Sequence, residues 1–74
     1  MFTIRVHRYT AGVSDVYGCA RYRLHHLTDP VVDLFRETSD AEPVAQVAIG
    51  AGDRAYVMNE RGDTVDHFRG RATA

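Results

Sequence analysis

The stretch Val44–Arg69, VAQVAIGAGDRAYVMNERGDTVDHFR, decides the expected fold because it reads as three short strands separated by two glycine-containing turns. Its second turn, Asn59–Gly62, begins with an asparagine that can bond nearby backbone and ends with a glycine that accepts positive φ. Runs rich in β-branched and aromatic residues flank this turn, as is typical of a β-hairpin. The first turn, Gly50–Asp53, leads back to the run Val44–Ile49.

Alternation along these strands predicts which side chains face inward. Ala45, Val47 and Ile49 share the more apolar face of their run and are expected to point into the core. In the next run, Tyr56 and Met58 share one face, while the other face is also apolar. A strand without a polar face is typical of a central strand or of one covered by a partner. The candidate interface residues are therefore Tyr56, Met58 and Phe68.

The N-terminal half continues the pattern of short strands. Residues 1–9 alternate cleanly and predict a half-buried strand, residues 10–15 predict a loop, and residues 19–25 predict a second strand. Residues 28–38, TDPVVDLFRET, are ambiguous. Pro30 at a first helical turn would suit a short helix over residues 29–38, but Val31 and Val32 favour a strand joined by a loop to Val44–Ile49.

The expected architecture is mainly β, a small antiparallel meander of about five strands that can curl into a half-barrel. A short helix at residues 29–38 would make it α+β instead. A chain of 74 residues is one domain, predicted here over residues 1–69, and residues 70–74 have too little apolar content to pack and are expected to fray.

Composition narrows the function classes. Cys19 is the only cysteine, which excludes a disulfide within the chain and is typical of a reducing compartment. The sequence has neither an apolar run long enough to span a membrane nor the pattern of a signal peptide. We therefore expect a cytoplasmic protein without membrane association.

Two groups of residues could carry chemistry, and we favour a structural interpretation of both. His25 and His26, with Asp29 and with His7, suggest a metal site, but adjacent histidines on a strand point to opposite faces. Cys19 with His26 suggests a nucleophile and base, yet a lone cysteine is more often a small buried apolar residue. We expect no catalytic residues, no metal and no cofactor, and hence no enzyme.

Charge suggests one macromolecular surface. Residues 1–27 carry four arginines against one aspartate, whereas residues 28–74 carry five arginines against nine acidic residues. If the first two predicted strands are neighbours, they would form one basic face with an aromatic residue beside it, made of Arg5, His7, Tyr9, Arg21, Arg23 and His25. Cations and aromatics together bind single-stranded nucleic acid, although the net charge of −1 argues against this.

A small sheet with an apolar face must close or cover that face with another chain. We therefore expect a non-enzymatic β module that binds another protein and forms a homodimer. Its size and its lysine-free composition suit an accessory or host-directed inhibitor protein of a bacterium or phage. A nucleic-acid-binding sheet that uses the basic N-terminal face is the alternative.

Overall fold

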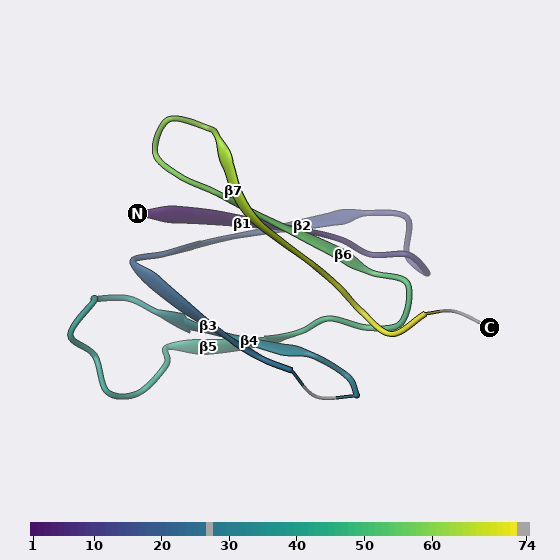
Figure 1. The fold of residues 1–74 in the computed structure, drawn as a ribbon, viewed down its shortest axis with the longest axis horizontal. Coiled ribbons are helices and arrows are strands. Elements are labelled where there is room, and N and C mark those ends of the chain that lie inside the picture. The colour runs from purple at the N-terminus through teal and green to yellow at the C-terminus, as the bar shows by residue number, and fades with distance from the viewer. Residues whose placement is uncertain (27, 73–74) are drawn as a thin grey trace.

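The computed structural model describes residues 1–26 and 28–72, and these residues form strands and no helix. The two layers in Figure 1 are a four-stranded sheet with the order β2-β1-β6-β7 and a three-stranded sheet with the order β3-β4-β5. All pairings between the strands are antiparallel. The strands are β1 (Phe2–His7), β2 (Ser14–Cys19), β3 (Arg21–His25), β4 (Val31–Phe35), β5 (Ala45–Ala48), β6 (Arg54–Met58) and β7 (Thr64–Arg69).

The prediction of a mainly β, antiparallel fold is confirmed. The structure has seven strands in two sheets, where the sequence predicts about five strands in one meander, and it is not a closed barrel. The ambiguous segment 28–38 contains strand β4, which pairs with β5 as a hairpin, so the alternative helix is not formed. No helix in the described part of the chain is long and apolar enough to cross a membrane.

The extra strands arise because the chain changes sheets at Ala20. The run predicted as one strand over residues 19–25 divides there, with β2 in the larger sheet and β3 in the smaller one. The backbone N–H of Ala20 donates to the carbonyl of Phe35 at 2.8 Å, which fixes the corner against β4. Strand β2 itself begins at Ser14, inside the segment predicted as a loop.

Two turns from the opening stretch form as predicted. Gly62 has a φ of 85° and donates its N–H to the carbonyl of Asn59 at 3.0 Å. The side-chain oxygen of Asn59 also accepts hydrogen bonds from the N–H groups of Arg61 and Asp63, so these backbone donors of the turn between β6 and β7 have partners. Gly52, in the turn between β5 and β6, has a φ of 80°.

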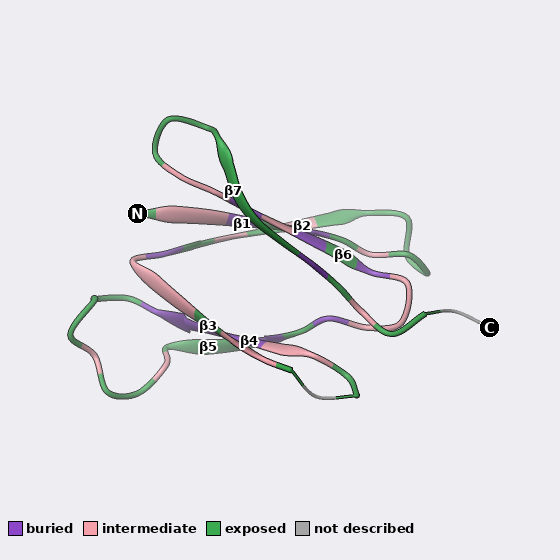
Figure 2. Ribbon diagram, viewed as in Figure 1, coloured by how far each residue is buried: buried purple, intermediate pink, exposed green. Residues whose placement is uncertain are grey.

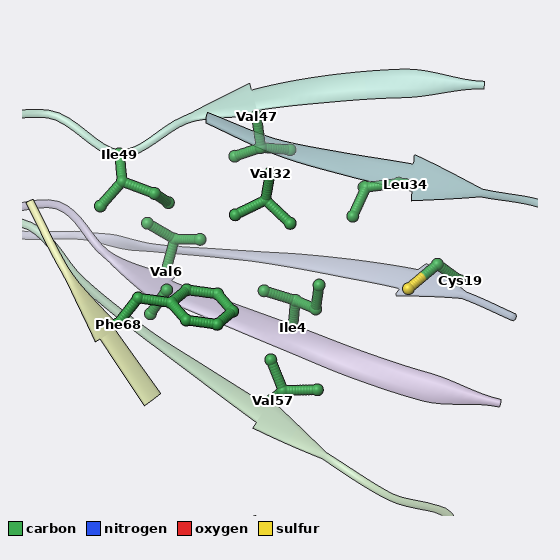
Figure 3. Packing of buried hydrophobic residues seen from close by; sticks show 10 residues of the cluster. Ile4, Val6, Cys19, Val32, Leu34, Val47, Ile49, Val57 and Phe68 are labelled. Atoms are coloured by element: carbon green, nitrogen blue, oxygen red, sulfur yellow. The ribbon is translucent and has the colours of Figure 1, made fainter. Parts of the chain in front are cut away.

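The core lies between the two sheets. Figure 3 shows side chains from β1, β6 and β7 meeting side chains from β4 and β5 in a single apolar layer. Figure 2 shows the same arrangement as buried segments in both sheets. Of the side chains predicted to face inward, Val47 and Ile49 are buried, whereas Ala45 is exposed. The larger buried apolar residues of this cluster are Ile4, Val6, Val32, Leu34, Val47, Ile49, Val57 and Phe68.

The chain beyond β7 stays attached to the turn between β5 and β6. Gly70 donates its N–H to the carbonyl of Asp53, and the N–H of Gly52 donates to the carbonyl of Arg71, both at 2.9 Å. These two hydrogen bonds join residues 70 and 71 to the turn, while the fraying expected over residues 70–74 stays a prediction. Residues 73 and 74 lie outside the described part of the chain.

Gly70 is a site at which only glycine fits. A Cβ at this position would overlap the backbone carbonyl of Gly50, which cannot rotate away as a side chain could. We expect Gly70→Ala to lower the free energy of unfolding by about 1–3 kcal/mol, the usual range for overpacking. Gly18→Ala is the control, because a Cβ at Gly18 meets nothing within 4 Å, and it should change stability by less than about 0.5 kcal/mol. Equal melting temperatures and equal denaturant midpoints for the two variants would contradict the close approach of Gly70 to Gly50.

Candidate functional site

The outward side of the four-stranded sheet carries only basic charge. Residues directly opposite one another in an antiparallel pair share a face, so the register assigns this side without ambiguity. Its basic members are three arginines and two histidines, and all of these are exposed. We call this surface the basic face; it consists of Thr3, Arg5, His7, Ser14, Val16, Gly18, Arg54, Tyr56, Met58, Thr64, His67 and Arg69.

One row of the basic face places two arginines side by side with a histidine beside them. His7 on β1 is opposite Arg54 on β6, and Arg54 is opposite Arg69 on β7. Like charges directly opposite one another on a sheet are destabilising. In the described part of the chain, no acidic side chain lies within ion-pair distance of Arg54 or Arg69. The row is therefore an uncompensated positive site that an anion would stabilise.

Aromatic rings form the neighbouring row. Tyr56 and His67 stack with their centroids 4.7 Å apart and an interplanar angle of 17°, and the ring of His7 meets Tyr56 edge-on at 5.4 Å. Arg5 lies opposite Tyr56 on the other side, on β1. A flat ring among cations is the arrangement on which unpaired bases stack while their phosphates are neutralised.

A groove of about 510 Å³ lies at the end of the basic face where β7 meets the turn between β5 and β6. Arg54 and Arg69 line it together with His7, Tyr9 and Arg71. Arg71 is held only loosely by an acid, at 3.8 Å from the exposed carboxylate of Asp29. The groove therefore extends the uncompensated positive charge from a flat surface into a concave one.

Asp53 is the buried group that shapes this groove. Its carboxylate accepts the N–H groups of Tyr9 and Gly50 at 2.8 and 3.0 Å and the guanidinium of Arg8 at 3.0 Å. Burial would raise the pKa of Asp53, but these hydrogen bonds outweigh it and lower the pKa. Burial would likewise lower the pKa of Arg8, but the carboxylates of Asp15 and Asp53 raise it. Arg8 is thus neutralised within the fold and adds no free charge to the groove.

In the three-stranded sheet, Arg23 and His25 bind a carboxylate of the same sheet. Asp33, 1% exposed, accepts hydrogen bonds from His25 at 2.6 Å, from Arg23 at 2.7 and 3.1 Å and from Gln46 at 2.9 Å. These donors, with His25 first, hold the pKa of Asp33 far below its ordinary value. A buried carboxylate with its oxygens satisfied in this way is a structural ion pair, and it compensates the charge of Arg23, whose side chain remains exposed.

Arg21 is also committed to the fold. Its guanidinium lies 3.7 Å from the ring centre of Phe35 and donates to the carbonyl of Asp40 at 2.7 Å. Phe35 is fully buried, yet it is not part of the cluster between the sheets. Arg21 therefore covers the ring of Phe35, which is buried on the outer side of the three-stranded sheet.

The basic face predicted from the sequence is consequently divided. The expectation that the first two predicted strands are neighbours is wrong, because β1 and β3 belong to different sheets. Arg5 and His7 lie on the basic face as defined here, and Tyr9 lines the groove at its end. Arg21, Arg23 and His25 lie on the outward side of the other sheet.

The candidate interface residues do not share a surface. Tyr56 and Met58 lie half-buried on the basic face, whereas Phe68 is in the core between the sheets and is 7% exposed. Adjacent residues of β7 point to opposite faces, which is why His67 rather than Phe68 accompanies Tyr56.

The two groups weighed for chemistry are not assembled into sites. His25 bonds Asp33, and His7 bonds Ser14 at 2.7 Å in the other sheet. Among residues 1–26 and 28–72, no three His, Cys, Asp or Glu side chains are placed to hold a metal ion. Cys19 is 2% exposed, and burial raises the pKa of its thiol, which disfavours the reactive thiolate.

Sequence reasoning missed Arg54, His67 and Arg69. Alternation along the strands does assign their faces, because Arg54 shares a face with Tyr56, and Arg69 shares a face with His67. What the sequence does not show is that β6 pairs with β1, far away in the chain, which brings these residues beside His7.

Comparisons of the chain with models of known protein families, with curated proteins and with solved structures gave no match.

The Asp33 ion pair predicts a specific pH dependence. Because folding lowers the pKa of Asp33, its contribution to stability is present above the unfolded pKa of about 4 and is lost as the pH falls below it. Asp33→Asn should lower the melting temperature at pH 7 and weaken the dependence of melting temperature on pH between about pH 4 and pH 2. Glu42→Gln is the control, because Glu42 is exposed and forms no ion pair with the described residues. An unchanged acid profile in Asp33→Asn would rule out this role.

Proposed function

We propose that the protein binds single-stranded nucleic acid on the basic face of its four-stranded sheet. The observation that carries the proposal is the row His7, Arg54 and Arg69, in which the two arginines are opposite each other without an acidic partner in the described residues. Phosphate groups along a strand would neutralise this row, and the affinity of such contacts arises mainly from counterion release.

The aromatic row supports a single strand over a duplex. Tyr56 lies between Arg5 and His67 in the row next to the cation row and stacks on His67, so a base can contact the ring while the flanking phosphates meet arginines. The bases of a duplex are stacked on each other and do not offer their faces to a flat sheet. Every base has such a face, so this arrangement favours binding with little sequence preference.

The same charges disfavour a homodimer built on this face. In a symmetric dimer the same patch is used by both copies, so Arg54 and Arg69 would meet their own counterparts. Like-charge contacts in an interface cost on the order of several kcal/mol, which is comparable to the free energy that a small dimer gains on association. A polyanion is the better match for this surface.

Removing the arginine pair tests the proposal. A labelled DNA strand of about 12 nucleotides should bind the protein at low salt, and its affinity should fall steeply between about 20 and 200 mM salt. Arg54→Gln and Arg69→Gln should each weaken binding several-fold and reduce the slope of log K against log salt by about 0.7. Fluorescence anisotropy at each salt concentration measures both quantities.

The matched control is Arg36→Gln. Arg36 is equally exposed but follows β4 in the other sheet, so its loss changes the net charge by the same amount without touching the basic face. Equal effects of Arg36→Gln and Arg54→Gln would show general electrostatic attraction and no defined face. Absence of binding at low salt would refute the proposal.

Self-association through a sheet edge is a second candidate function, and it corresponds to the homodimer and the protein-binding role expected from the sequence. Strand β2 is an edge of the four-stranded sheet, and Val16 on it is 56% exposed. Open edges invite pairing with another strand, and pairing of β2 with its copy would join two basic faces into one longer surface.

Sedimentation at micromolar concentration tests this candidate. A species of twice the chain mass is expected, and Val16→Lys should shift it toward monomer because a charge on an edge strand discourages pairing. Val44→Lys is the control, since Val44 is 52% exposed but lies beside the other sheet. A monomer at all concentrations, or equal effects of the two variants, would remove the edge-paired dimer.

A further inference from the structure

A second groove, of about 390 Å³, opens between the two sheets where β3 faces β7. Its apolar walls come from Tyr22 and Leu24 on β3, from Phe68 on β7, and from Pro30. The rings of Tyr22 and Phe68 are 6.1 Å apart and tilted by 52°. The groove is also lined by polar side chains, and grooves of this size that combine apolar walls with polar groups able to orient a ligand are the usual form of small-ligand sites; the polar lining residues are His26, Asp66, His67 and Arg69.

Polar groups lie at one side of this groove. The hydroxyl of Tyr22 donates to the carboxylate of Asp66 at 2.9 Å, which links the two sheets across the opening. Burial, followed by this carboxylate, raises the pKa of Tyr22 to about 12, so the hydroxyl stays protonated as a donor. The other oxygen of Asp66 accepts only the N–H of His67 among the described residues, which leaves lone pairs for a further donor.

The groove is continuous with the basic face. Arg69 lines both this groove and the larger one at the end of the face, and His67, which stacks on Tyr56, lines it as well. A strand whose phosphates follow Arg54 and Arg69 therefore passes directly over its opening. At the opening, Arg69 places a cation beside the carboxylate of Asp66, which suits a ligand that carries both a phosphate and a hydrogen-bond donor.

We propose that this groove receives one unstacked base of the single strand bound on the basic face. The inference rests on the proposed function and adds to it a defined base site. The aromatic wall formed by Tyr22 and Phe68 contacts the base from one side, Arg69 holds the adjacent phosphate, and Asp66 accepts a hydrogen bond from an exocyclic amino group. Acidic side chains accept such a bond from cytosine, so the site favours an amino-bearing base over thymine.

Abasic substitution combined with a filled groove tests the base site. In the wild-type protein, an abasic site scanned along the labelled strand should lower the affinity about tenfold at one position and much less elsewhere. Leu24→Trp should fill the groove and weaken binding of the intact strand by a similar factor. The abasic site should then have no further effect in Leu24→Trp, because the base and the groove act as one interaction. Additive losses, or a flat abasic scan, would overturn the inference.

A crosslinking measurement on the unmodified protein covers the case in which Leu24→Trp fails to fold. A strand carrying 5-iodocytosine, which keeps the exocyclic amino group, at the sensitive position should crosslink on irradiation to Tyr22 or Phe68, identified by mass spectrometry. Crosslinks only to Tyr56 or Tyr9 would refute the base site and leave nucleic-acid binding on the basic face intact. A strand that does not bind at low salt would refute both proposals.

Discussion

The carboxylate of Asp53 fixes the region in which the chain passes from one sheet to the other, and the rest of the structure depends on it. It binds the N–H of Tyr9 after β1, the N–H of Gly50 after β5 and the guanidinium of Arg8. Its own backbone carbonyl accepts the N–H of Gly70 after β7. One buried group thus holds segments that are distant in the sequence, in a chain too short to rely on its apolar core alone. Because β6 begins and β7 ends beside this group, it also positions the arginines of the basic face.

The fold separates its charges by sheet, and this explains why the net charge of −1 says little about binding. On the three-stranded sheet, Asp33 neutralises Arg23, and Arg21 is stacked over Phe35. On the four-stranded sheet, the acidic residues of β2 and β7 are at inward-facing positions, where Asp15 accepts a hydrogen bond from Arg8 and Asp66 accepts one from Tyr22. Alternation along each strand therefore leaves the outward side wholly basic. A slightly acidic chain can in this way present a strongly positive surface.

Local features of the fold could be predicted from the sequence, and non-local ones could not. The hairpin at Asn59–Gly62 is specified by its own turn residues, and β4 and β5 are joined by a short loop, so both follow from neighbouring residues. The corner at Ala20 has no turn signal, because the alternating pattern runs through it while the chain changes sheets. The pairing of β1 with β6 likewise leaves no local trace. Since Arg54 reaches His7 only through that pairing, the cation row could not be predicted although each of its residues could be assigned a face.

The position of Arg69 connects the architecture to the proposed chemistry. It is the last residue of β7, and Gly70 follows at a point where the backbone approaches Gly50 too closely for any side chain. This close approach brings the end of β7 against the turn between the sheets, so that Arg69 borders the groove at the end of the basic face and the groove between the sheets. A cation at such a junction is repelled by Arg54 within the free protein. The fold tolerates this cost because Asp53 and the core hold the strands in place, and a bound phosphate would convert the repulsion into attraction.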